Sequence, residues 1–229
     1  MELSPEQRVI CEEFAATLRI LGRAGFEMGS AGHITVADPE RSDRFWANPF
    51  GVPFVETRPE DIVLVDLEGD VVYGKHGCKG ARSQTAIYAA RPDVRAVVHV
   101  HGLNALAWSN LGKPFRALTT ESAEVHGLQE VSASEGAPLV DGFADPRVKI
   151  LFSRFHGCTT AGATLAEAAF YTLAVDRATR VELLLANVAG VNSVPDEVIA
   201  KWAIPPALAD GDFRQEIDRE IRTAELSSW

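Results

Sequence analysis

The chain is poor in cysteine and in positive charge. Its 229 residues include three cysteines, and 22 Lys and Arg residues stand against 32 Asp and Glu, which leaves a formal net charge of −10. Three scattered cysteines exclude a disulfide framework and a C-x-x-C metal site, and they favour a reducing, cytoplasmic compartment. The acidic balance argues against nucleic acid or an anionic membrane as the main partner. An anionic small molecule remains possible if its site is locally positive.

Long apolar runs are also missing. No stretch approaches the roughly 20 apolar residues that span a bilayer, and the start, MELSPEQRV, lacks the basic and then apolar order of a signal peptide. The remaining composition, 46% hydrophobic and 24% charged, is ordinary for a globular enzyme. The sequence contains no internal repeat, low-complexity tract or linker. We therefore expect one domain over residues 1–229, with a helical tail from about residue 195.

Caps and turn residues predict the order of elements. Ser4 as N-cap with Gln7 three residues later predicts a helix from Pro5, and Gly22 ends it. An apolar stripe on this helix is expected to contain Val9, Ile10, Phe14, Leu18 and Leu21. Strands are expected over residues 33–38, 43–49, 95–101 and 147–153, and a hairpin of two strands over 61–74. Helices are expected over residues 83–91, from residue 104, over 164–190 and in the tail. Residues 117–145 have no clear pattern.

The stretch RAVVHVHGLN, residues 95–104, interrupts an apolar strand with two histidines. Side chains two apart on a strand point to the same face, so His99 and His101 share one face, whereas Val98 and Val100 share the other. Two imidazoles on one face are typical of a metal site. The alternative is a strand with two half-buried polar residues that pair with backbone groups, and further ligands have to decide between the two.

A third histidine favours the metal interpretation. The chain has six histidines, and His156 lies in RFHGCTTAG, just past a predicted strand end and before Gly157 and an expected helix start. Polar residues at strand ends gather at one edge of a sheet, where α/β enzymes build their sites. Three histidines leave positions open for water or substrate, as a catalytic metal requires.

Several segments, in the right order, resemble one family. These segments are GSAGHITV, DIVLVDLEGDVV, ARPDVRAVVHVHG and FHGCTTAGATLAEAAFYTLAVDRA, and they are similar to the class II aldolase/adducin family over roughly residues 5–190. The resemblance implies a three-layer α/β/α sandwich with a mixed, largely antiparallel central sheet. It also implies one divalent metal ion (zinc, manganese or iron) held by His99, His101 and His156, and a homotetramer with sites between subunits.

Two departures from the family's sugar-phosphate aldolases bear on the reaction. Those enzymes carry a Ser-Ser-Glu element whose glutamate is the general acid/base, and the family spacing places it at Gly80, in HGCKGARSQ. Glycine cannot transfer a proton, and no serine pair precedes it to hold a phosphate. In the phosphate loop, His33 stands where the family has asparagine.

The remaining chemistry favours decarboxylation. A metal with open positions stabilises negative charge on a bound oxygen in both retro-aldol cleavage and decarboxylation, but carbon dioxide leaves without a base. We expect a decarboxylase of a hydroxylated, aromatic carboxylic acid, because the resembled family includes such enzymes. The alternatives are an aldolase for an unphosphorylated hydroxy-keto substrate, an iron-dependent oxygenase, and a non-catalytic adducin-like assembly module.

Other polar residues are candidates for proton transfer and substrate binding. The carbanion left by decarboxylation needs a proton, and histidine titrates near neutral pH. Arginine suits bidentate contact with a carboxylate, which makes Arg82 the favoured contact. The proton-transfer candidates are His33, His76 and His126, and the substrate-binding candidates are Arg82, Lys79, Asn48, Gly32 and Glu121. For each of them, an ordinary loop or surface position is the alternative.

Overall fold

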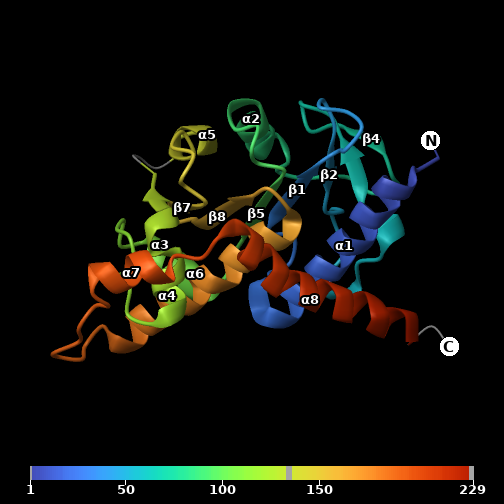
Figure 1. The fold of residues 1–229 in the computed structure, drawn as a ribbon. Helices are drawn as coiled ribbons and strands as arrows, with labels where there is room; N and C mark the ends of the chain where they lie inside the picture. Colours follow the sequence, from blue (N-terminus) through green and yellow to red (C-terminus); the bar gives the residue numbers. More distant parts are fainter. Residues whose placement is uncertain (1, 133–135, 227–229) are drawn as a thin grey trace.

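The protein is built around a central sheet (Figure 1). A computed structural model describes residues 2–132 and 136–226. Its strands are β1 (His33–Ala37), β2 (Phe45–Ala47), β3 (Val63–Val65), β4 (Val71–Tyr73), β5 (Ala96–Val100), β6 (Gln129–Val131), β7 (Ile150–Ser153) and β8 (Gly157–Gly162). They lie in the order β4-β3-β2-β1-β5-β8-β7-β6. Neighbours are antiparallel except β6 and β7, so the sheet is mixed and largely antiparallel, as predicted.

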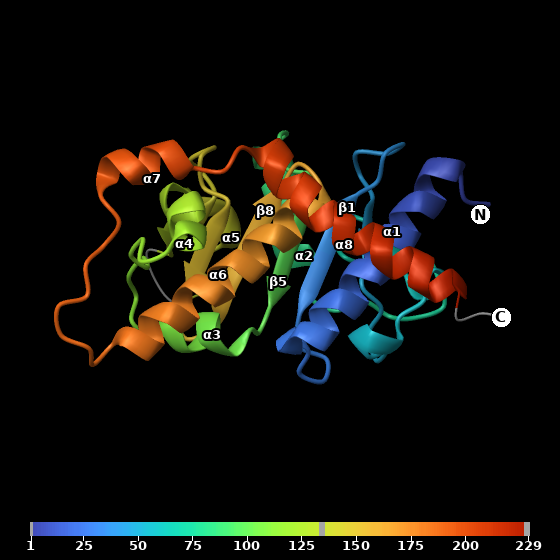
Figure 2. The same ribbon diagram turned by 60° about the horizontal axis from the view of Figure 1, so that its bottom comes forward.

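Helices cover both faces of this sheet (Figure 2). On one face lie α1 (Pro5–Leu21) and α6 (Leu165–Leu185), with α8 (Pro206–Leu226) across them, and on the other lie α2 (Arg82–Ala90) and α5 (Leu139–Gly142). The remaining α-helices are α3 (Leu103–Ser109), α4 (Thr120–Val125) and α7 (Asp196–Trp202). This arrangement confirms the three-layer α/β/α sandwich. In the described ranges, no helix combines the length and apolar character needed to cross a bilayer.

The first helix shows how sequence and packing combine. Ser4 accepts a hydrogen bond from the Gln7 amide, and the Gln7 side chain accepts one from the Ser4 amide, as the capping box predicts. The expected stripe is partly wrong, because Val9 is 50% exposed. Gln7 takes the buried position one turn before Cys11, and its amide donates to Asp38 Oδ2 at 2.9 Å. The buried face therefore follows Gln7, Cys11, Phe14, Leu18 and Leu21.

Two expectations along the chain are corrected by the structure. Residues Gly157–Gly162 do not begin a helix but form β8, which pairs with β5 on one side and β7 on the other. The stretch 117–145 is more regular than its pattern indicates, because it contains α4, β6 and α5 among its described residues. The hairpin of β3 and β4 is confirmed, and so is the helix expected from residue 164, which is α6 with Thr164 as its N-cap. The turn that carries His156 therefore joins two neighbouring strands.

Candidate metal centre

Three histidine side chains, here called the histidine triad, converge at one end of the central strands. His99 lies in β5, His101 follows its last residue, and His156 lies in the turn between β7 and β8. One ring nitrogen from each lies within 4.8 Å of the other two. The Nε2 atoms of His99 and His101 are 3.1 Å apart, and the rings cross at 78°, 76° and 79°. The sheet thus brings together all three predicted metal ligands.

The backbone of β8 orients His99. Its Nδ1 lies 3.0 Å from the carbonyl oxygen of Cys158 and 3.1 Å from Thr159 Oγ1. Because a carbonyl oxygen only accepts hydrogen bonds, Nδ1 carries the proton, and the Nε2 lone pair remains free for a metal. The register of the sheet fixes this contact, since His99 and Thr159 are directly opposite in the β5–β8 ladder.

The triad has the chemistry and spacing of a divalent metal site. Two nitrogens about 2.1 Å from a tetrahedral ion lie roughly 3.4 Å apart, close to the observed separation. Burial, followed by the neighbouring His101 and His156, lowers the pKa of His99 to about 3, and burial also lowers the pKa of His101. Neutral imidazole is the form that binds metals. Three such ligands leave positions for water or substrate.

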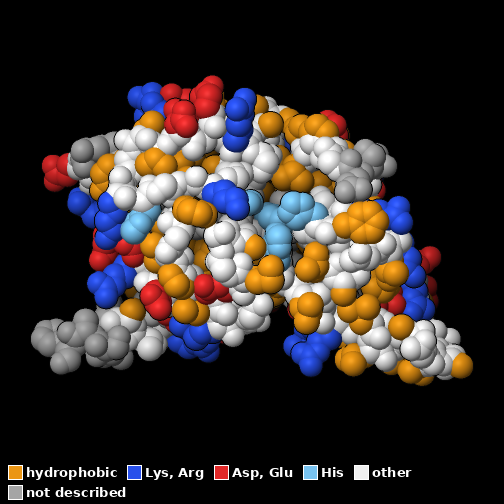
Figure 3. Space-filling model, turned by 180° about the vertical axis from the view of Figure 1, so that it is seen from behind, with side chains coloured by type: hydrophobic (Ala, Val, Ile, Leu, Met, Phe, Trp, Pro, Cys, Tyr) orange, Lys and Arg blue, Asp and Glu red, His pale blue; other side chains and the backbone are white. Residues whose placement is uncertain are grey.

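A cavity of about 420 Å³, here called the triad cavity, opens beside these ligands. His99 and His156 line it together with His33, Arg154 and Phe155. Figure 3 shows the histidine side chains gathered in a hollow of this face, with hydrophobic side chains around it. Among the described residues that line the cavity, there is an arginine and no carboxylate. Arg154 therefore brings positive charge to the wall of the cavity.

The His33 ring fills the space that a side chain at position 80 would need. His33 is opposite His99 in the β1–β5 ladder, and their rings stack with centroids 5.9 Å apart. A Cβ on Gly80 would lie 2.3 and 2.4 Å from atoms of the His33 ring. His33 Nδ1 is buried without a hydrogen-bond partner in the described part of the chain. Burial, followed by the charge of Lys79, lowers the pKa of His33, so this ring is neutral near pH 7.

Comparison with known proteins identifies the family of this chain. The family model described as "Class II Aldolase and Adducin N-terminal domain" covers residues 12–183. The chain belongs to this family. Decarboxylase NovR of Streptomyces niveus is 34% identical over 196 residues, which are 80% of this chain and 72% of that protein.

Two further similarities bear on the chemistry of this class II aldolase family member. The protein named 4-hydroxy-3-prenylphenylpyruvate oxygenase/4-hydroxy-3-prenylbenzoate synthase, from Streptomyces roseochromogenus subsp. oscitans, is 33% identical over 195 residues, which are 80% of this chain and 70% of that protein. Among solved structures, L-fuculose 1-phosphate aldolase from Glaciozyma antarctica PI12 has a TM-score of 0.84 and 28% identity, and the match covers 93% of this chain and 90% of that chain.

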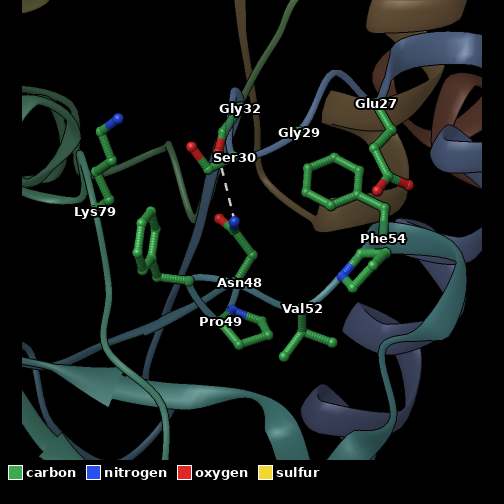
Figure 4. A pocket seen from close by; sticks show the side chains of 12 residues that line it. Glu27, Gly29, Ser30, Gly32, Asn48, Pro49, Val52, Phe54 and Lys79 are labelled. Carbon is green, nitrogen blue, oxygen red and sulfur yellow. Dashed lines mark hydrogen bonds between the residues drawn. The ribbon is translucent and has the colours of Figure 1, made fainter.

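A second cavity of this family member, of about 210 Å³, collects three predicted substrate-binding residues, Gly32, Asn48 and Lys79. Figure 4 shows Lys79 and Glu27 on opposite sides of it, with Asn48 between them. Asn48 Oδ1 accepts from the amide of Ile34 at 2.9 Å, and Nδ2 donates to the carbonyl oxygen of Gly32 at 3.4 Å. Asn48 therefore holds the glycine-rich loop against β1.

Two predicted proton-transfer residues lie apart from the residues that line the triad cavity. His76 Nε2 is 3.1 Å from Asp61 Oδ1, in a shallow depression near the surface. His126 follows α4, and its ring lies edge-on to Phe115 with centroids 6.4 Å apart. Of the three candidates, the structure brings His33 to the triad.

Two predicted substrate-binding residues are also placed outside both cavities. Arg82 is exposed at the start of α2, although its neighbour Ser83 lines the triad cavity. Glu121 lies on α4 and pairs with Arg177 of α6 at 3.4 Å. Among the described residues that line the triad cavity, the cation is Arg154, on the turn that carries His156.

Sequence patterns did not point to Arg154, Phe155 or Thr159. Arg154 and Phe155 directly precede His156 in SRFHG. The available signal was therefore a cation and an aromatic residue next to a candidate metal ligand. Thr159 lies in GCTTAG, whose small residues do not indicate a strand. Its role depends on the pairing of β8 with β5.

The lowered pKa of His99 predicts that the metal-free protein loses stability in acid. In the unfolded protein a histidine side chain is protonated below about pH 6.5. In the folded protein His99 stays neutral until about pH 3. The unfolded state therefore binds more protons in this window, and His99 alone should lower the free energy of unfolding by up to about 1.4 kcal/mol per pH unit as the pH decreases. Urea denaturation of chelator-treated protein from pH 7 to pH 5 measures this slope. The His99→Asn variant should have a shallower slope, and an equal slope would contradict the prediction.

Proposed function

We propose that the protein is a metal-dependent carbon–carbon lyase that decarboxylates a hydroxylated, aromatic carboxylic acid. Membership of the class II aldolase family and similarity to a protein named as a decarboxylase support lyase chemistry. The observation that carries the proposal is the histidine triad, which has the spacing of a metal site and lies beside Arg154 at the triad cavity. Gly80 stands where the family's sugar-phosphate aldolases have a catalytic glutamate.

The residues at the site would have separate roles in this reaction. His99, His101 and His156 would hold one zinc, manganese or iron ion, which would stabilise the negative charge that develops on a substrate oxygen. When the bond to the carboxylate breaks, its electron pair stays on the substrate carbon, and that carbon needs one proton. Solvent would supply this proton and His33, which lines the triad cavity, would deliver it, because imidazole transfers protons near neutral pH.

Positive groups around the site would hold the substrate carboxylate before it leaves. Arg154 lines the triad cavity and makes no ion pair with a described residue. Arg82 and Lys79 flank Gly80 in sequence and remain candidates for the same anion. Asn48 and the loop at Gly32 would hold the remainder of the substrate in the second cavity.

A second candidate function is an iron-dependent oxygenase. The similarity to a protein named as a prenylphenylpyruvate oxygenase favours it, and three histidine ligands leave positions for further groups on an iron ion. Oxygen uptake with the iron-loaded protein distinguishes the two, because simple decarboxylation consumes none.

Carbon dioxide release tests the main proposal. Chelator-treated protein, reloaded separately with zinc, manganese or iron(II), should release carbon dioxide from a panel of hydroxybenzoates, hydroxymandelates and 4-hydroxyphenylpyruvate. L-fuculose 1-phosphate should be a poor substrate, because no serine pair precedes Gly80. The control is the same protein without added metal. Efficient cleavage of L-fuculose 1-phosphate without release of carbon dioxide would show an aldolase instead.

We also propose that the protein works as a homotetramer in the cytoplasm. The family resemblance supports the tetramer, and the scarcity of cysteine supports the compartment. Light scattering of the purified protein at micromolar concentration measures the assembly, and a monomer would count against it.

A further inference from the structure

Phe155 has an unfavourable backbone conformation for its residue type. Among the described residues, it is the one non-glycine with positive φ, at 65°. This left-handed conformation suits glycine or asparagine, and a bulky aromatic residue rarely adopts it. The turn requires it, because Ser153 and Gly157 are paired across β7 and β8 and the His156 amide donates to the Ser153 carbonyl at 3.0 Å.

Burial of the ring does not compensate for this strain. The Phe155 side chain is 53% exposed and belongs to none of the buried core clusters. It lines the triad cavity together with His156, the next residue and a proposed metal ligand. Strained residues beside reactive groups persist where the side chain has a use that a better-fitting residue lacks.

Arg154 places a positive charge next to the Phe155 ring. Its guanidinium carbon lies 5.1 Å from the centroid of the Phe155 ring, as in a cation–π pair. Arg154 also lies near Gly112, where an added Cβ would be 3.5 Å from Nε. The aromatic face and the guanidinium are therefore held together at one wall of the cavity.

We propose that Phe155 and Arg154 form an aryl-carboxylate clamp that makes the triad cavity select planar aromatic carboxylates. The ring of the substrate stacks on Phe155, and its carboxylate lies within the field of Arg154. This inference rests on the proposed function, since it specifies the substrate class of the same site. Phe155 acts here as a specificity-determining residue and transfers no proton.

Binding of two matched acids to the zinc-loaded full chain tests the clamp. The probes are 4-hydroxybenzoate and trans-4-hydroxycyclohexanecarboxylate, which share charge and hydroxyl but differ in aromaticity. Calorimetry should give roughly threefold to tenfold tighter binding of the aromatic acid. Equal binding, or no detectable binding of either acid, would overturn the clamp.

Two substitutions separate specificity from structure. Phe155→Asn should raise the melting temperature by about 2–8 °C because asparagine tolerates positive φ, yet it should abolish the aromatic preference. Phe155→Leu retains the strain and apolar bulk, so it should lose the preference without the gain in stability. Zinc content should equal that of the parent in both variants.

Three outcomes would overturn the proposal: an aromatic preference that survives in Phe155→Asn, a loss of zinc in that variant, or an unchanged preference with an altered oligomeric state. The second would mean that the ring only supports His156, and the third that it packs against another copy. Because these measurements need no turnover, an intact preference in a protein that releases no carbon dioxide would refute the proposed reaction and leave the clamp standing.

Discussion

Replacing His99 with asparagine should remove the bound metal and lower turnover by more than about a hundredfold, since even partners behind a ligand change metal affinity by ten- to a hundredfold. The asparagine amide occupies a position similar to that of Nδ1, so it can retain the hydrogen bond to the Cys158 carbonyl while the Nε2 ligand is lost. The fold should persist, because β5 pairs along its length with both β1 and β8. Elemental analysis and carbon dioxide release measure the two effects.

The same substitution at His76 provides the matched control. The His76 ring pairs with Asp61 and lines neither the triad cavity nor the second cavity. The metal content of His76→Asn should therefore equal that of the parent protein. A His99→Asn protein that retains stoichiometric metal, or a His76→Asn protein that loses it, would show that the triad is not the metal site.

Replacing Gly80 with alanine should destabilise the protein by about 2–5 kcal/mol and impair turnover. The φ of Gly80 is 82°, and an L-residue there costs about 1–2 kcal/mol. The added Cβ would also lie 2.3 Å from the His33 ring, and overpacking of this kind costs about 1–3 kcal/mol. A shift of the ring that relieves this clash would disturb its stack with His99. Urea denaturation and turnover of the metal-loaded variant measure both consequences.

Gly25 separates the two causes of this effect. Its φ is 86°, but nothing lies within 4 Å of the position of an added Cβ. Gly25→Ala should therefore cost only about 1–2 kcal/mol. In a His33→Ala background the cost of Gly80→Ala should decrease to that level, because the clash is removed. Equal costs for Gly80→Ala with and without the His33 ring would contradict the coupling.

The sequence predicted those elements whose ends are determined by residues close together in the chain. The capping box at Ser4, the N-cap at Thr164 and the turn at Gly69, whose φ is 87°, act through residues a few positions apart in the chain. The spacing of His99 and His101 on one strand is equally local. These features were visible in the sequence because their partners lie close by in it.

The features that the sequence did not predict depend on contacts between residues far apart in the chain. Strand β8 has the small residues GCTTAG and is recognisable only through its neighbours β5 and β7. Helix α4 has Thr119 as its N-cap, and Ser122 completes the capping box at the position where glutamate or glutamine is the recognisable signal. The contact of Gly80 with His33 joins residues far apart in the chain, and the strain at Phe155 follows from a hairpin that was not expected. Each of these depends on tertiary structure rather than on propensity.

The register of the sheet places His33, His99 and Thr159 in one transverse row across β1, β5 and β8. Hydrogen bonds of the backbone ladder set the spacing of this row, whatever side chains it carries. A substitution at position 33 should therefore change a side chain that lines the triad cavity and leave the backbone positions of the proposed metal ligands in place. Changes at positions 33 and 159, which flank His99 in this row, would alter the chemistry of the cavity while the strand pairing keeps His99 in its place.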